Sequence, residues 1–204
     1  MAGRWAAAGP YVTRIIFAVA VAGQTLLVGS LVLSILSPTK RIWPPPGRWS
    51  WQFWFTWSLT SVALAGGMIL GFLDWNSWVL PHWVRLPVGG LLIAAGISFA
   101  FWGLRTLGSH ASLGLGGELV SSGPYRHSRN PEYVGDIVAL LGYAIVCNSL
   151  LVLVVAALGA AWFALAPYAE EPWLHRQLGD RYDDYARQVP RFIGFRRTPR
   201  KGVA

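Results

Sequence analysis

The sequence is poor in charged residues and in cysteine. Only 13% of its 204 residues are Asp, Glu, Lys or Arg, whereas a soluble domain averages about 25%. The single cysteine, Cys147, excludes an internal disulfide and a multi-cysteine metal site. The four histidines do not have the spacing of metal ligands, so the sequence predicts that no metal is bound.

Apolar residues are abundant instead, and they are grouped into long uncharged runs. They make up 54% of the chain, and several of its 12 tryptophans flank these runs, as expected for side chains at a membrane interface. The formal charge of +8 does not indicate nucleic-acid binding, because the basic residues sit beside the apolar runs. It indicates contact with lipid headgroups and a defined membrane topology.

The apolar runs predict an all-α, multi-pass membrane bundle of about five helices. The first run is too long for a signal-peptide core and is interpreted as a retained span. An uncharged stretch of 33 residues, Ile137 to Ala169, is too long for one crossing and contains the polar break Cys147-Asn148-Ser149. It therefore predicts a helical hairpin within residues 131–169. The five predicted spans are Tyr11–Leu36, Trp51–Leu73, Leu86–Leu104, Pro131–Val146 and Leu150–Tyr168.

The distribution of basic residues predicts the orientation of these spans. Five crossings place 14 Lys and Arg on one side and 3 on the other. By the positive-inside rule, the glycine-rich loop 105–130 and the C-terminal segment from Ala169 face the cytosol of a protein in the cell membrane. The C-terminal segment is expected to continue the fifth helix and then to lie on the membrane surface as an amphipathic stretch.

The first candidate site lies between Gly123 and Gly135. Pro131 suits the first position of a helix and Asn130 suits its N-cap. A helix start of this kind presents N–H groups and positive potential to an anionic group, and Arg126 and Arg129 add charge. The alternative is a turn at the membrane surface with snorkelling arginines.

The second candidate site begins with the adjacent carboxylates Glu170 and Glu171 at the end of a span. Such a pair is costly at a helix C-terminus unless a cation or a polar ligand faces it. The alternative is that both side chains reach solvent and pair with Arg126 or Arg129.

Together the two stretches resemble the superfamily of membrane methyltransferases that includes isoprenylcysteine carboxyl methyltransferases and phosphatidylethanolamine N-methyltransferases. That family's pattern is G-x-Y-x-x-x-R-H-P-x-Y-x-G, a helical hairpin, E-E-x-x-L-x-x-x-F-G-x-x-Y-x-x-Y and V-P-R, and this chain is similar from Gly117 to Arg191. The resemblance implies three N-terminal spans in residues 1–104 and a methyltransferase core in residues 105–204.

The resemblance also implies S-adenosylmethionine as cofactor, held between the cytosolic loop and the C-terminal amphipathic segment. The residues at positions that match the family's cofactor contacts are His110, Gly117, Glu118, Leu119, Val120, Tyr125, Asn130, Pro131, Glu132, Tyr133, Glu170 and Glu171. The residues expected to assist the reaction are Glu170, Glu171, Tyr133 and Arg129.

Three positions depart from the family pattern. Asn130 replaces a histidine, which excludes a histidine base there. Ala166 stands where carboxyl methyltransferases of the family tend to carry an arginine, which weakens the case for a carboxylate acceptor. Gly194 replaces the final proline. The expected partner is a lipid or lipid-like acceptor in the bilayer, either a phospholipid amine or a prenylated or long-chain phenol or pyrone.

Two other functions compete with this interpretation. One is a membrane reductase of the steroid-reductase type, which would use NADPH. The other is a non-enzymatic small transporter or assembly factor. A transporter is expected to carry charged residues near the middle of its spans, and the first three predicted spans contain only Gln24 as a strongly polar residue deep in the run.

Overall fold

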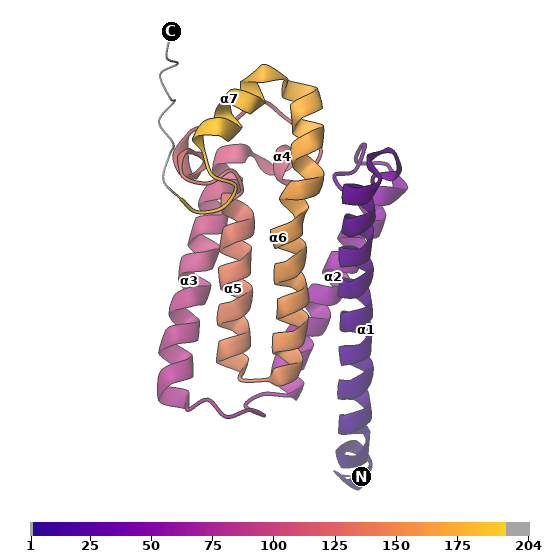
Figure 1. Cartoon of the computed structure of the whole chain (residues 1–204). Coiled ribbons are helices and arrows are strands. Elements are labelled where there is room, and N and C mark those ends of the chain that lie inside the picture. Colours follow the sequence, from indigo (N-terminus) through magenta and orange to yellow (C-terminus); the bar gives the residue numbers. More distant parts are fainter. Residues whose placement is uncertain (1, 195–204) are drawn as a thin grey trace.

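A computed structural model describes residues 2–194, with side chains from residue 9 onward. Over this range the chain forms helices and no strand, which confirms the predicted all-α class (Figure 1). The main helices are joined by two short 3₁₀ turns, Pro38–Lys40 and Gly123–Arg126. The helices are α1 (Ala2–Leu36), α2 (Trp51–Leu73), α3 (His82–Leu107), α4 (Ser109–Ser112), α5 (Pro131–Cys147), α6 (Leu150–Leu178) and α7 (Asp180–Gln188).

Four of these helices are long and apolar enough to cross a membrane: α1 (from Gly9), α2, α3 and α6. Helix α5 has 17 residues and completes the predicted bundle of about five. Large apolar side chains point outward from the bundle, including Phe72 at 81% and Leu91 at 70% exposure. Such a surface suits contact with lipid chains.

The long helices run alternately up and down. Helices α3, α5 and α6 lie side by side, and α1 and α2 lie beyond α6 (Figure 1). Helix α1 packs against both α2 and α6. The end of α3, the start of α5 and the end of α6 meet at one end of the bundle, together with α4 and α7 (Figure 1). We call this the polar end.

The break between α5 and α6 is the predicted hairpin turn. Asn148 adopts the left-handed conformation (φ 49°, ψ 49°) that ends α5, and its N–H donates to the Ala144 carbonyl at 3.0 Å. The Ser149 hydroxyl then accepts from the Val152 N–H at 3.1 Å and caps α6. The polar triplet therefore ends one helix and starts the next within a single turn.

Some helix boundaries differ from the sequence-based prediction. Helix α1 begins at Ala2 instead of Tyr11, and α3 begins at His82 and reaches Leu107. Gly108 ends α3 because it takes a positive φ of 88°. Helix α6 continues past Tyr168 to Leu178, as expected for the C-terminal segment. The rest of that segment, residues 195–204, lies outside the described residues.

Helices α3 and α5 approach each other through glycine. A Cβ added at Gly96 of α3 would lie 2.5 Å from the Ala139 nitrogen and 2.6 Å from the Gly135 oxygen. Both are backbone atoms of α5, so they cannot move away as the tip of a flexible side chain could. The close contact of small residues is a common basis of helix packing in membranes.

We expect Gly96→Ala to lower the melting temperature of the detergent-solubilised protein, because the two helices must separate, at a cost of about 1–3 kcal/mol. The control is Gly90→Ala on the same helix, where a Cβ meets nothing within 4 Å. That change should be neutral or stabilising, since alanine favours a helix over glycine. Equal melting temperatures for the two variants would contradict this packing.

Candidate functional site

The polar end brings the two predicted site segments together. The Arg129 N–H, just before α5, donates to the Pro190 carbonyl at 3.0 Å. The Tyr185 hydroxyl of α7 donates to the Tyr125 carbonyl at 2.8 Å. Residues 125–135 and 170–191 therefore lie together, as the resemblance to the family implies.

Glu170 is held by uncharged hydrogen-bond donors. One of its oxygens, Oε1, accepts hydrogen bonds from the Trp43 indole N–H at 2.6 Å and from the Tyr133 hydroxyl. Trp43 comes from the connection between α1 and α2 and is 2% exposed. No cationic side chain within residues 9–194 forms an ion pair with Glu170.

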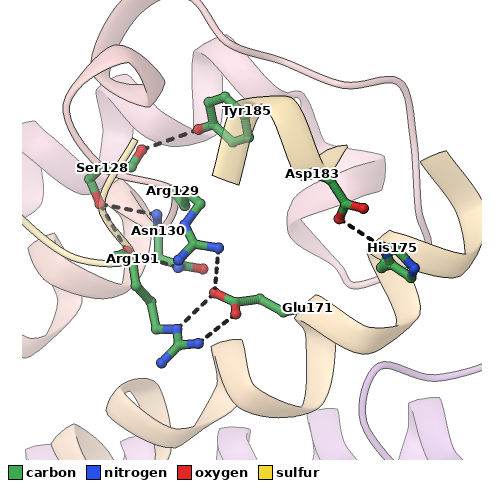
Figure 2. Close-up of polar contacts among 8 residues, drawn as sticks. All are labelled: Ser128, Arg129, Asn130, Glu171, His175, Asp183, Tyr185 and Arg191. Carbon is green, nitrogen blue, oxygen red and sulfur yellow. Dashed lines mark hydrogen bonds and ion pairs between the residues drawn. The ribbon is translucent and has the colours of Figure 1, made fainter. Parts of the chain in front are cut away.

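Glu171 has the opposite environment, because two arginines surround it. Arg129 approaches Oε1 at 2.9 Å, and Arg191 binds both carboxylate oxygens through Nε at 2.7 Å and Nη2 at 2.6 Å (Figure 2). The hydrogen bonds from Glu171 raise the pKa of Arg191 above its usual value. The alternative of arginine pairing therefore holds for Glu171, which pairs with Arg129. It does not hold for Glu170. Arg126 is exposed and forms an ion pair with neither glutamate among the described residues.

A third carboxylate, Glu132, lies in the first turn of α5. Its Oε1 accepts from the Ser112 hydroxyl at 2.8 Å and from the Tyr125 hydroxyl at 3.0 Å. Burial, followed by the nearby Glu132 charge, raises the pKa of Tyr125 well above its ordinary value. Tyr125 therefore stays a neutral donor that fixes the Glu132 carboxylate.

Asn130 precedes α5 as predicted, but its side chain does not cap the helix. Its amide donates instead to the Arg191 carbonyl at 3.0 Å (Figure 2). The expectation of an Asn130 side-chain cap is therefore wrong. The amide is drawn away because the segment around Arg191 crosses the start of α5.

These groups line one cleft, which we call the polar cleft. Its wall includes an irregular segment, residues 116–120, as well as aromatic side chains. A Cβ at Gly116 (φ 84°) would meet Trp173 and Gln177 at 3.2 Å, so glycine lets the backbone pass close to α6. The predicted residues that line it are Gly117, Glu118, Leu119, Val120, Tyr125, Arg129, Asn130, Glu132, Tyr133, Glu170 and Glu171.

Two predicted residues lie elsewhere. His110 is exposed, and its Nδ1 lies 3.1 Å from the Gly116 carbonyl oxygen instead of facing the cleft. Pro131 is fully buried at the start of α5 and does not line the cleft. Both residues therefore lie in the chain around the cleft and outside its inner surface.

Helix α7 closes one side of the cleft with its apolar face. Tyr182 and Tyr185 are buried there and pack with Val189 against Leu119 and Leu174. Burial raises the pKa of Tyr182 to about 12, so its hydroxyl is neutral at physiological pH. The apolar face of α7 therefore contacts protein, which the expectation of a membrane-surface segment did not include.

The sequence did not reveal several lining residues. Trp173 and Ser112 are not fixed positions of any sequence motif, and Trp43 lies 127 positions before its partner Glu170. Arg191 belongs to the V-P-R motif, which could have suggested a partner for Glu171.

The cleft offers a varied set of polar groups. It combines the carboxyl groups of Glu132, Glu170 and Glu171, the irregular backbone of residues 116–120, tyrosine hydroxyls and Trp173. The Arg129 Nε is buried and has no hydrogen-bond partner within the described part of the chain. The surface can therefore bind a ligand that has hydroxyl or cationic groups, a planar ring and a carboxylate.

The helical membrane fold and a polar cleft at one end define a class of membrane-embedded proteins with a small-molecule site. Residues 84–181 match the family model described as phospholipid methyltransferase. The predicted resemblance to the membrane methyltransferase superfamily is thereby confirmed over this part of the chain. With the apolar helices, the match supports a membrane methyltransferase in general.

Two curated proteins are also similar to this chain. The nickel-cobalt-cadmium resistance protein NccN of Alcaligenes xylosoxydans xylosoxydans is 28% identical over 138 residues, which cover 67% of this chain and 62% of NccN. The cobalt-zinc-cadmium resistance protein CzcN of Cupriavidus metallidurans is 29% identical over 138 residues, which cover 67% of this chain and 61% of CzcN. The matches thus span about three fifths of each relative. No solved structure is significantly similar.

We expect Glu171→Gln to lower the melting temperature of the solubilised protein. Arg129 and Arg191 would lose their counter-charge, and because they are 13% and 28% exposed the cost should be about 2–3 kcal/mol, somewhat below that of a fully buried pair. The control is Asp184→Asn, whose ion pair with Arg187 is mostly exposed. A loss of similar size in both variants would contradict the assigned role of Glu171.

Proposed function

We propose that this protein is an integral membrane methyltransferase that uses S-adenosylmethionine to methylate a lipid-like acceptor. The observation that carries the proposal is the single cleft formed by two segments far apart in sequence, most of which lies within the family match. The names of the two similar proteins refer to metal resistance and name no reaction, so they do not direct the choice of substrate. No three His, Cys, Asp or Glu side chains gather into a possible metal site within the described residues.

The residues of the cleft fit the proposed cofactor. Glu118, Glu170 and Glu171 supply acceptors for ribose hydroxyls or for an amino group. The buried Arg129 Nε–H, which has no partner, is suited to a carboxylate. Tyr182, Tyr185 and Trp173 provide flat apolar surface for an aromatic base. When bound, S-adenosylmethionine supplies an electrophilic methyl group.

The protein's own residues then have three tasks: to orient, to exclude water and to stabilise charge. Tyr133 and Trp43 hold the Glu170 carboxylate in one position through their hydrogen bonds. Glu171 is neutralised by its arginines and fixes the segment that closes the cleft. The Glu170 carboxyl group has no ionic partner among the described residues and is available to a cationic group, so we assign it the larger electrostatic role.

We expect Glu170→Gln to weaken binding of S-adenosylmethionine at least ~10-fold, since removing one charged partner of a hydrogen bond costs about 1.5–3 kcal/mol. Equilibrium binding to protein in nanodiscs measures this, with NADPH as a second ligand to test the reductase alternative. Asp184→Asn serves as the matched control and should bind like the wild type. Normal binding by Glu170→Gln, or binding of NADPH in place of S-adenosylmethionine, would contradict the proposal.

The orientation is a second part of the proposal. Apart from Arg14 and Arg85, the arginines and lysines from residue 9 to 194 belong to segments at the polar end. The positive-inside rule therefore supports a cytosolic polar cleft in a protein of the cell membrane.

Cysteine labelling in whole cells tests this orientation in a Cys147→Ser background. Ser121 and His82 are both exposed, one beside the cleft and one at the start of α3 on the opposite end. We expect Ser121→Cys to react with a membrane-impermeant maleimide only after permeabilisation, and His82→Cys to react in intact cells. The reverse pattern would place the cleft outside the cytosol.

A further inference from the structure

A second, mostly apolar space lies between the helices below the polar cleft, and we call it the apolar cavity. Its volume is about 650 Å³, and side chains of α1, α2, α3, α5 and α6 line it. Leu64 and Met68 of α2 and Ile97 of α3 line the cavity and are also exposed on the surface of the protein. The cavity therefore opens sideways, between α2 and α3, toward the surface that faces lipid.

The apolar cavity and the polar cleft share a wall. Ser112, Glu132 and Tyr133 line both spaces. A ligand head in the cavity and a reactive group in the cleft would thus meet at the first turn of α5.

The charges that line the cavity are all negative. Among the described residues around it, Glu132 and Asp136 are charged, and no Lys or Arg takes part. Glu132 is already satisfied by Ser112 and Tyr125 on the side of the cleft. Asp136 lies one helical turn deeper on the same face, and no described side chain or backbone group donates a hydrogen bond to it.

An independent observation indicates a polar ligand in the same space. The hydroxyl of Thr56 and the indole N–H of Trp57, both lining the cavity, are buried and have no hydrogen-bond partner within the described part of the chain. Thr56 is 3% exposed. Buried polar atoms are rarely left unpaired, and a carboxylate inside a membrane span is retained for function by default.

We propose that the apolar cavity binds a lipophilic amine without an anionic group, and that Asp136 receives the amine nitrogen. This inference rests on the proposed methyltransferase function and specifies its acceptor. An unpaired carboxylate in a low-dielectric site favours a cationic or N–H-bearing head. A phospholipid phosphate or a fatty carboxylate would meet Glu132 and Asp136 without any cation in the cavity wall to offset the repulsion.

Asp136 would also take the proton that the amine must lose. The protonated amine transfers one proton to the Asp136 carboxylate, and its freed lone pair forms a bond to the methyl carbon of a sulfonium donor. The carbon–sulfur bond breaks, the sulfur keeps that electron pair and becomes a neutral thioether, and the product is a methylated ammonium ion. The unpartnered Thr56 hydroxyl can accept a hydrogen bond from an N–H of the amine.

The experiment uses the full chain in nanodiscs with deuterated-methyl S-adenosylmethionine and mass spectrometry of the products. The four probes are N-methyldodecylamine, 4-dodecylphenol, dodecanoic acid and dioleoylphosphatidylethanolamine. We expect methyl transfer to the amine at least ~10-fold faster than to any other probe. Binding of the cofactor with no transfer to the amine, or with faster transfer to another probe, would overturn this inference and leave the proposed function in place. Failure to bind the cofactor at all would overturn both.

Variants separate the role of Asp136 from folding. Asp136→Asn should lower kcat/KM for the amine at least ~100-fold, the usual size of a lost proton acceptor, while cofactor affinity stays within twofold. Asp136→Glu, which keeps the carboxylate, should recover part of the loss, and Asp184→Asn should behave as wild type. Unchanged turnover by Asp136→Asn, or loss of its cofactor binding, would contradict the assignment.

Discussion

The ion pairs of Glu171 hold the polar end of this protein together. They join the end of α6 to the approach to α5 through Arg129 and to the segment after α7 through Arg191 (Figure 2). Without the Glu171 carboxylate, Arg129 and Arg191 would be partly buried with no counter-charge between them. Because Arg129, Asn130, Glu170 and Glu171 all line the polar cleft, its shape depends on these segments staying together.

The two adjacent glutamates have separate tasks because neighbours on a helix point about 100° apart. Glu171 faces the arginines and is neutralised, so its task is structural. Glu170 faces Trp43 and Tyr133, which donate hydrogen bonds but carry no charge. One pair of residues thus supplies both a structural ion pair and a carboxyl group that has no ionic partner among the described residues.

The sequence predicted the features that depend on local chemistry. The long apolar runs predicted the helices, and Asn148 and Ser149 predicted the hairpin turn. The meeting of the two segments was expected only from the family resemblance and from the basic residues that place both on one side of the membrane. The sequence could not predict Trp43 as a partner of Glu170, because that contact depends on how a loop between two other helices folds over the bundle. Likewise, Asn130 has an ordinary N-cap sequence, and only the path of the chain near Arg191 draws its amide away.

Trp43 has a consequence for how proteins of this kind diverge. It lies outside residues 84–181, as do the α1 and α2 residues that contribute to the lining of the apolar cavity. The part of the chain that matches the family model thus carries most of the polar cleft and most of the apolar cavity, whereas α1 and α2 contribute a smaller share of the cavity lining. Exchange or drift of the first two helices would therefore reshape one part of the apolar cavity while most of the polar cleft stays unchanged, so that similarity over residues 84–181 alone does not describe the whole cavity.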